Sequence, residues 1–408
     1  MAGYVAWMPD REVTLHRDPS RWHAERLRAF GDTDGHRRLW ALLDRLASVF
    51  WAASRGGIKL PLRGAGDVVR AARALPVGGW PLVRYLGWTM GDALRACGLG
   101  EDRALRGLLG MLLQDTVHSG VDEAPLINGA LGVTIRGAGL TRARGGTYGF
   151  WRRVLARYAE LGGRLELAAR VDGVERSGRR YVVQTRRGVF EAPQVVCTLP
   201  VQDAVRLAPG LLQEGLGRFV ARDAGSLGGA LVVFLGVPES EVEGQALTHH
   251  QVLLDYDAPL GDGNNLFIST SSPGDTLSAP EGHRAVMIST HCELEGWEGL
   301  ERAAYRAKKE AMAARLIGIA RRVYPTLGER AVVRKAATPR TYARFTRRGR
   351  GAVGGVRQAL GNSNQRAVPY DVGPPGFWQA GDTTWPGLGT VACILGSRHV
   401  ADAVASYR

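Results

Sequence analysis

The chain has 408 residues, 45% of them hydrophobic and 23% charged, a balance that fits a globular protein with a sizeable core and excludes a disordered chain. It has no run of about 20 apolar residues that could span a membrane, and because its first residues lack the pattern of a secretory leader we expect no signal peptide. Its four cysteines lack metal-binding spacing, and we expect them to be small buried residues in a reducing compartment. The formal net charge of +14 comes from scattered arginines without an aromatic-basic motif, so we expect no nucleic-acid binding and instead attraction to anionic lipid headgroups.

The first 140 residues are expected to be mainly helical after a short pair of strands. Residues 3–17 have a strand pattern on either side of a turn at Pro9-Asp10. Helices are expected over residues 21–30 and 36–51, because apolar side chains recur at helical spacing. We interpret residues 1–140 as a helical part that contributes to the substrate site and associates with a membrane.

Residues 60–120 are also predicted to be helical, and they are unusually apolar. Within them, residues 75–88 combine leucines, aromatic side chains and arginines, while Gly78, Gly79 and Pro81 interrupt any continuous helix. Two interpretations of this segment stay open. It is either an interfacial segment that enters lipid headgroups or a helical cap packed against the rest of the protein.

Residues 141–210 show one helix followed by short strands. A glycine-rich turn precedes the helix, which is predicted over residues 150–161 with apolar side chains on one side. The strands are predicted at residues 165–167, 169–175, 181–185, 189–191 and 194–200.

Residues 211–345 show a repeated strand pattern and then a long charged helix. The strands are predicted at residues 230–235, 251–255, 265–270 and 284–291, and the helix at 298–323. A meander with a helix of this kind is expected to form one wall of a substrate chamber. Because no Gly/Ser-rich linker separates the segments, we predict a mixed α/β fold whose two domains are discontinuous in sequence.

The stretch near the C-terminus carries the clearest functional signal. It comprises an apolar strand, a turn, an irregular loop and a helix, at residues 377–380, Gly381-Asp382, Pro386 to Gly389, and Thr390 to Val404. A carboxylate, a glycine loop and a helix N-terminus form a cradle for a large polar cofactor, because helix N–H groups attract an electron-rich group. An ordinary strand-turn-helix connection is the alternative.

Residues 381–401, GDTTWPGLGTVACILGSRHVA, resemble the C-terminal flavin motif of the phytoene desaturase-like flavoproteins. Upstream, residues 337–346 and the pair Gly354-Gly355 resemble the carotenoid 3,4-desaturase branch of that family. The resemblance is strongest over residues 330–404.

This resemblance implies an α/β flavoprotein fold of the FAD/NAD(P)-binding type, with FAD as cofactor. Residues 141–210 and 346–408 would form FAD-binding segments, and residues 211–345 the sheet and helix of the substrate domain. Asp382 would hold the ribityl-pyrophosphate, the backbone of Gly389, Thr390 and Val391 would lie beside the isoalloxazine ring, and the backbone of Val171 would contact the adenine. The implied cofactor-binding residues are Gly381, Asp382, Gly387, Gly389, Thr390, Val391 and Val171.

One expected motif is missing from the sequence. A flavoprotein of this kind should open with a strand, a Gly-x-Gly-x-x-Gly turn, a helix and an acidic residue about 20 positions later. No glycine cluster of the chain has that context. We therefore expect an N-terminally truncated chain, or a start assigned too late, that would lack the main FAD-binding half.

The resemblance implies FAD-dependent desaturation of a long acyclic carotenoid, by a cytoplasmic protein held peripherally on the cytoplasmic membrane. A carotenoid isomerase or ketolase on the same scaffold is the first alternative. A non-catalytic binder of apolar ligands is the second. A soluble amine oxidase is disfavoured, because residues 330–350 resemble the carotenoid enzymes.

The sequence singles out no catalytic residue and no metal ligand set. Desaturation needs a flavin and a dry apolar tunnel rather than a nucleophile or a pair of carboxylates. The histidines that could handle a proton are expected to be structural instead; they are His249, His250, His291 and His399.

Overall fold

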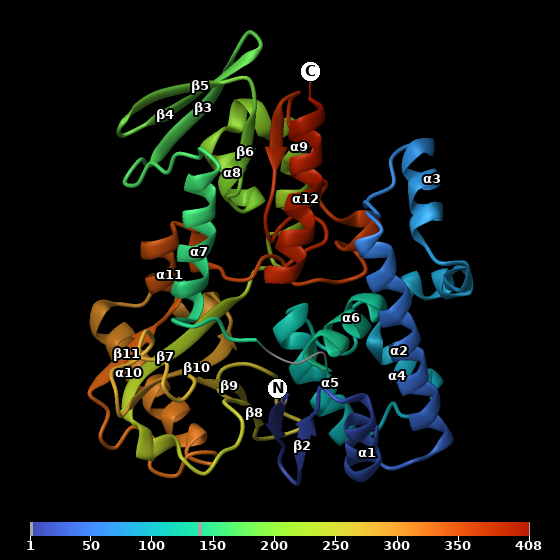
Figure 1. Ribbon diagram of the computed structural model, residues 1–408, viewed down its shortest axis with the longest axis vertical. Helices are drawn as coiled ribbons and strands as arrows, with labels where there is room; N and C mark the ends of the chain where they lie inside the picture. The colour runs from blue at the N-terminus through green and yellow to red at the C-terminus, as the bar shows by residue number, and fades with distance from the viewer. Residues whose placement is uncertain (1–2, 138–140, 408) are drawn as a thin grey trace.

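The computed structural model describes residues 3–137 and 141–407 (Figure 1). A seven-stranded sheet forms the lower part in this view, a group of helices lies beside it, and two smaller sheets with further helices form the upper part. The mixed α/β fold predicted from the sequence is confirmed. None of the described helices is both long and apolar enough to cross a bilayer.

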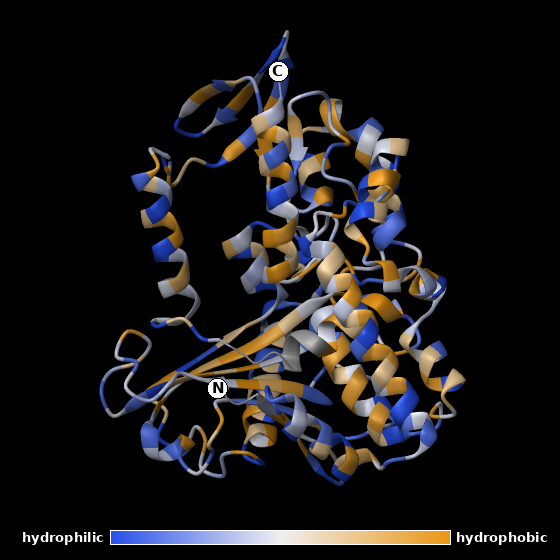
Figure 2. Cartoon of the chain, turned by 45° about the vertical axis from the view of Figure 1, so that its right-hand side comes forward, coloured by the Kyte–Doolittle hydropathy of each residue, from blue (hydrophilic) through white to orange (hydrophobic). Residues whose placement is uncertain are grey.

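The seven-stranded sheet has the order β11-β7-β10-β9-β8-β1-β2, and every neighbouring pair is antiparallel except β1 and β8. Figure 2 shows that its central strands are predominantly hydrophobic. The strands are β1 (Tyr4–Trp7), β2 (Glu12–Leu15), β7 (Gly229–Pro238), β8 (His249–Leu253), β9 (Asn265–Thr270), β10 (His283–Cys292) and β11 (Val333–Ala337).

One face of this sheet is covered by α10 (Arg302–Ala320). Buried and half-buried residues alternate along β10, as the period of two in a strand requires. Val286 of β10 and Leu316 of α10 belong to the same buried cluster. Ala285 and Met287 therefore project from the opposite face of the sheet.

The helices beside the sheet form the largest buried cluster of the described residues. They are α1 (Pro19–Phe30), α2 (Asp34–Arg55), α4 (Met90–Ala96), α5 (Arg103–Thr116) and α6 (Leu126–Gly137). Thr33 and Asp102 cap α2 and α5 by accepting backbone hydrogen bonds, and such a cap stabilises a helix by about 1 kcal/mol. Leu39, Leu43 and Leu46 are buried, so the apolar stripe read from the sequence is core.

The segment between α2 and α4 packs on α2 and α6 through one side. It contains α3 (Ala65–Ala74) and the 3-10 helix η1 (Val77–Gly87). Leu82 is buried in the main cluster, whereas Val77 is 88% exposed and Trp80 is 53% exposed. One side of the segment is packed and the other is exposed, so both interpretations of this segment stay predictions.

The upper part combines a three-stranded antiparallel sheet with a two-stranded parallel one. The strands are β3 (Val171–Ser177), β4 (Arg180–Thr185), β5 (Gly188–Ala192), β6 (Val195–Cys197) and β12 (Phe377–Gln379). The helices of the upper part are α8 (Val201–Leu207), α9 (Pro209–Asp223) and α12 (Thr390–Ser406), whereas α11 (Pro339–Thr346) lies beside β7 and β11 of the large sheet. Short 3-10 helices are η2 (Glu239–Val242), η3 (Glu295–Trp297), η4 (Gly349–Gly351) and η5 (Asn364–Arg366).

Helix α7 (Gly146–Glu160) stands between the large sheet and the three-stranded sheet (Figure 1). Its position in the sequence matches the predicted helix, but none of its described side chains is buried. The apolar side chains Phe150 and Tyr158 are 38% and 48% exposed. An apolar stripe on one side predicts a helix, but whether that side is buried depends on how the rest of the chain folds.

One predicted strand is wrong. Residues 165–167 form no strand, and Leu165 and Leu167 are exposed. An apolar alternation this short becomes a strand only when a neighbouring strand pairs with it, and none of the described residues does so here.

Candidate functional site

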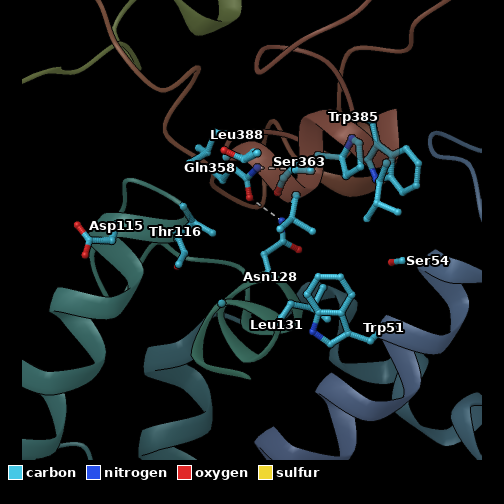
Figure 3. A pocket seen from close by; sticks show the side chains of 18 of the residues that line it. Trp51, Ser54, Asp115, Thr116, Asn128, Leu131, Gln358, Ser363, Trp385 and Leu388 are labelled. Carbon is cyan, nitrogen blue, oxygen red and sulfur yellow. Dashed lines mark hydrogen bonds between the residues drawn. The ribbon is translucent and has the colours of Figure 1, made fainter. Parts of the chain in front are cut away.

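A cavity of about 1690 Å³ lies between the large sheet, the helices beside it and the loop before α12. Side chains of α2, α6, η1 and the large sheet line it, together with residues 358–366 and the loop before α12. Figure 3 shows Trp51 and Leu131 on one side, and Trp385 and Leu388 on another. Most of these side chains are apolar, so the cavity suits a ligand with a large apolar surface.

The large sheet forms one wall of the cavity through Phe267 of β9 and through Ala285 and Met287 of β10. The meander therefore lines a cavity, and its assignment as the wall of a substrate chamber stays a prediction. The helix predicted over residues 298–323 does not line the cavity. It corresponds to α10, which packs on the opposite face of the sheet.

Besides the side chains of Trp385 and Leu388, the loop before α12 presents the backbone of Gly389 to the cavity. Gly389 has a φ of +91°, and a Cβ added there would meet no atom within 4 Å. Gly389 is also the N-cap of α12 and makes no side-chain capping bond. The first N–H groups of a helix have no partner within the helix, and Thr390 and Val391 line the cavity. The positive end of the helix dipole therefore faces this space.

A network of amide side chains holds this loop against α6. Asn128 Nδ2 donates to Gln358 Oε1 at 2.7 Å, and Asn364 Nδ2 donates to Asn128 Oδ1 at 2.9 Å. Gln358 Nε2 reaches the carbonyl oxygen of Pro386 at 3.5 Å. Figure 3 shows Asn128 and Gln358 facing each other across the cavity wall. Sequence reasoning missed this network, because its members come from distant segments and match no local motif.

Replacing Gly387 with alanine tests how tightly the loop is held. Gly387 has a φ of +122°, and an added Cβ would lie 1.9 Å from Gln358 Nε2. Gly387→Ala should lower the free energy of unfolding by about 1–3 kcal/mol, through backbone strain and loss of the Gln358 contacts. Chemical denaturation measures this difference. Gly361→Ala is the matched control, because its added Cβ meets nothing within 4 Å; equal stabilities of the two variants would contradict the prediction.

The structure places Asp382 behind the loop rather than in the large cavity. Its carboxylate forms an ion pair with the guanidinium of Arg348, and both side chains are largely buried. Asp382 and Gly387 line a separate small pocket next to the loop. Gly355 packs directly against the backbone of Asp382, since an added Cβ would lie 2.3 Å from the Asp382 carbonyl oxygen.

The predicted cofactor-binding residues are thus only partly brought together. Gly389, Thr390 and Val391 line the cavity. Gly381 occupies the turn after β12 with a φ of +124°. Val171 lies at the start of β3 and packs with the buried cluster of the upper part. The roles assigned to the seven predicted cofactor-binding residues remain predictions. These residues are Gly381, Asp382, Gly387, Gly389, Thr390, Val391 and Val171.

The segment that resembles the 3,4-desaturase branch has a structural role here. Residues 337–346 comprise the last residue of β11 and the whole of α11, and none of them lines the cavity. Thr338 is fully buried, and its hydroxyl forms a hydrogen bond of 2.6 Å with the hydroxyl of Tyr305. Thr338 and Thr341 also form a capping box at the start of α11.

Of the four histidines named in the sequence, His249 lines the cavity and the other three do not. His250 is fully buried between Trp7 and Tyr324, and burial lowers its pKa to about 4. His291 packs edge-on against His118, and burial lowers the pKa of both, that of His118 to about 3. His399 packs on Trp385. The structural role expected for His250, His291 and His399 agrees with these contacts.

The cradle at α12 fits the ring end of a flavin. Backbone at Gly389 faces open space, and the N–H groups at the helix start have no side-chain cap. Such donors match the electron-rich edge of a flavin ring. The fit rests on Gly389, Thr390 and Val391.

A family model and several curated proteins match parts of the chain. The family model described as flavin-containing amine oxidoreductase matches residues 109–405. The chain is 30% identical over 182 residues to the chloroplastic prolycopene isomerase of Arabidopsis thaliana, and 29% identical over 182 residues to prolycopene isomerase 1 of an Oncidium hybrid cultivar. Each match covers 43% of this chain and only 30% of the relative.

Solved structures share the fold over nearly the whole chain. A redesigned putrescine oxidase is 13% identical, with a TM-score of 0.60, over 99% of this chain and 81% of that one. Cyclohexylamine oxidase from Brevibacterium oxydans is 14% identical, with a TM-score of 0.55, over 99% of this chain and 80% of that one. At this identity the likeness concerns the fold alone.

The family model spans most of the chain, and the fold matches that of flavin-dependent amine oxidases. FAD is the cofactor that this match implies. The chain belongs to the family of flavin-containing amine oxidoreductases, which are FAD-dependent oxidoreductases.

Proposed function

We propose that the chain acts, with FAD, on a long acyclic carotenoid. The observation that carries the proposal is the cavity of about 1690 Å³, which extends from the loop before α12 (Pro386 to Gly389) to an apolar face of the large sheet. Ligand pockets usually measure about 300–1,000 Å³, so this one has room for a long polyene beside a flavin ring. The prolycopene isomerases that match part of the chain support a carotenoid as the substrate class.

Desaturation, in the manner of a 3,4-desaturase, is the first reaction that we propose. It is supported by the resemblance of residues 337–346, a segment outside the cavity lining. Isomerisation is the second candidate, and the matched prolycopene isomerases favour it. Both reactions require a polyene held against a flavin in a site without water.

The residues of the cavity have distinct tasks under this proposal. Leu131, Phe267 and Met287 provide apolar walls that exclude water and align an extended polyene. The backbone of Thr390 and Val391 directs the positive end of α12 toward the flavin ring. A flavin bound there supplies hydride transfer to and from carbon.

The mass of the pigment before and after reaction tests the proposal. Desaturation removes two hydrogens, isomerisation leaves the mass unchanged, and ketolation adds oxygen. A pigment recovered unaltered in both mass and double-bond geometry would indicate a binder instead of an enzyme.

We also propose that the protein associates peripherally with the anionic face of the cytoplasmic membrane, from the cytoplasmic side. Val77, Trp80 and Leu86 form an exposed apolar edge on η1, and Arg73 and Arg84 are exposed beside it. Trp80 and Leu86 line the cavity as well. The same edge can therefore face lipid and give a carotenoid a direct path from the bilayer into the cavity.

Co-sedimentation with vesicles of anionic lipid tests this association. Binding should be strong at low salt and weaken as salt rises, because each basic residue near the surface contributes about 1 kcal/mol of screened attraction. Trp80→Ser should reduce binding by about tenfold, since burying a large apolar side chain contributes about 1.5–3 kcal/mol.

Phe345→Ser is the matched control for that experiment. Phe345 is 74% exposed on α11, which lies on the opposite side of the molecule from α3 and η1 (Figure 1). This variant should sediment like the unaltered protein. Absence of binding at low salt, or equal losses for the two variants, would refute this docking edge.

A further inference from the structure

The large cavity contains one acidic side chain, to which the reactions proposed above give no task. Asp115 is the only carboxylate among the described residues that line this cavity. It is half-buried near the end of α5 and accepts a hydrogen bond from Gln251 Nε2 of β8. The side chain of Gln251 is itself held by packing, because this residue is only 1% exposed. A donor fixed in this way sets the direction of the carboxylate.

The end of α5 and the loop that precedes α12 are bound to the same residue, Gln358. Its backbone N–H donates to the carbonyl oxygen of Val117 at 2.9 Å, and its side chain reaches the carbonyl oxygen of Pro386 at 3.5 Å. Figure 3 shows Asp115 on the same side of the pocket as Gln358. The carboxylate of Asp115 and the backbone at Gly389 therefore belong to one cavity wall.

Desaturation needs an acceptor for a proton as well as an acceptor for a hydride. One C–H bond loses its hydrogen together with both electrons to FAD, which is thereby reduced. The adjacent C–H bond loses a proton, and the electron pair of that bond forms the new double bond. Positive charge develops on the polyene while the hydride leaves. A carboxylate stabilises this charge and then accepts the proton, and the stabilisation is large in a cavity without water.

His249 is the other side chain that could accept a proton among the described residues of the cavity lining. Its ring nitrogens lie 2.9 Å from the hydroxyl of Thr248 and 3.4 Å from that of Ser269, and Ser269 also accepts a hydrogen bond from Arg142. A proton on His249 would add a second positive charge close to this guanidinium. An aspartate that accepts a proton passes from negative to neutral, so Asp115 suits a cationic stage of the substrate better.

We propose that Asp115 is a catalytic residue, whose carboxylate faces the reacting carbons of the polyene, stabilises the positive charge that develops there and accepts the proton in desaturation. Gln251 is a positioning residue, because it acts through Asp115. This inference rests on the proposed carotenoid function and assigns the proton acceptor of that reaction.

Binding of a charged mimic tests the carboxylate without requiring turnover. The probes are two acyclic polyenes of equal length and shape. One carries a dimethylammonium group within the chain near one end, and the other has carbon in place of that nitrogen. The ammonium imitates the positive charge of the reacting polyene. Quenching of tryptophan fluorescence reports binding, because Trp51, Trp151 and Trp385 line the cavity.

Asp115→Asn should weaken binding of the ammonium polyene by at least about tenfold, through loss of the opposite charge, and leave binding of the neutral polyene within about twofold. Asp115→Glu keeps the charge and should retain most of the affinity for the ammonium. Glu123→Gln is the matched control, because Glu123 is exposed further along the chain and does not line the cavity. Asp115→Ser removes the same charge and provides the test if Asp115→Asn fails to fold.

Reduction of the flavin by substrate supplies a second measurement. The flavin-bound protein is mixed with an acyclic carotenoid in the absence of oxygen, and the loss of flavin absorbance is followed over time. Asp115→Asn should slow this reduction by at least about a hundredfold, the usual contribution of a positioned acid or base. Glu123→Gln should reduce its flavin as fast as the unaltered protein does.

The possible outcomes separate this inference from the function on which it rests. Equal affinities of the unaltered protein and Asp115→Asn for the ammonium polyene, or equal rates of flavin reduction, would overturn the role of Asp115 and leave the carotenoid function intact. Loss of ammonium binding in His249→Gln but not in Asp115→Asn would overturn that role as well. Binding of neither polyene by the unaltered protein would overturn the proposed function itself.

Discussion

Carotenoid recovered after incubation with the flavin-bound protein should be lighter by two hydrogens for each new double bond, and its absorption should move to longer wavelength. The reason is that a desaturation extends conjugation at a reacting end of the polyene. Mass spectrometry and absorbance of the extracted pigment measure both changes. With flavin binding shown by absorbance and an acyclic carotenoid supplied, an unchanged mass would count decisively against desaturation. A changed double-bond geometry at equal mass would support the isomerase instead.

A variant that fills the cavity sharpens this experiment. Ala285→Trp places a large side chain on the sheet face that lines the cavity, so conversion should fall by at least about tenfold. Val333→Trp is the control, because Val333 is 47% exposed on the outer strand β11 and lies outside the cavity lining. Equal conversion by both variants would place the reacting polyene elsewhere.

The free energy of unfolding should decrease strongly as the pH falls from 6.5 to 4. Burial lowers the pKa of His250 to about 4 and that of His118 to about 3, from the usual 6.5. The unfolded chain therefore binds more protons than the folded one in this interval. The stability is fully present above pH 6.5 and is lost as pH falls toward the folded pKa values. For His250 alone the loss amounts to about 3 kcal/mol.

Thermal unfolding midpoints at several pH values between 7.5 and 4 measure this dependence. His250→Gln removes one of the titrating groups, so its midpoint should change less steeply with pH, whatever its stability at pH 7.5. His23→Gln is the control, because His23 is exposed on α1. A His250→Gln profile parallel to that of the control would show that protonation of His250 does not drive the acid instability.

Local sequence patterns predict the elements of this fold well, and they fail where partners decide the outcome. The hairpin at residues 3–17 and the four strands of the meander form where apolar alternation predicts them. The pairing of β1 with β8 could not be predicted, because nothing in Tyr4–Trp7 specifies a partner more than 240 positions away. The exposure of α7 could not be predicted either, because its apolar stripe predicts a helix but does not show which part of the fold packs against that helix.

The candidate site could be predicted only where its residues lie close together in the sequence. Glycines and a helix start lie within one short stretch, so the loop at Gly389 and its place beside a cavity followed from sequence. The ion pair of Asp382 with Arg348 and the bond of Asn128 with Gln358 join residues 34 and 230 positions apart. Contacts of that separation depend on the folded topology, and no spacing rule reports them.

The parallel pairing of β1 with β8 also constrains when the protein can fold during its synthesis. Trp7 pairs with Val252, so β1 must wait for nearly two thirds of the chain before its partner leaves the ribosome. At about 5–20 residues per second this delay lasts roughly 12–50 seconds. During that time the hairpin of β1 and β2 has an open strand edge, which is a template for pairing with other chains. The local helices α1 to α6 can pack in the meantime, so this protein should depend on shielding of its first strands while it is being made.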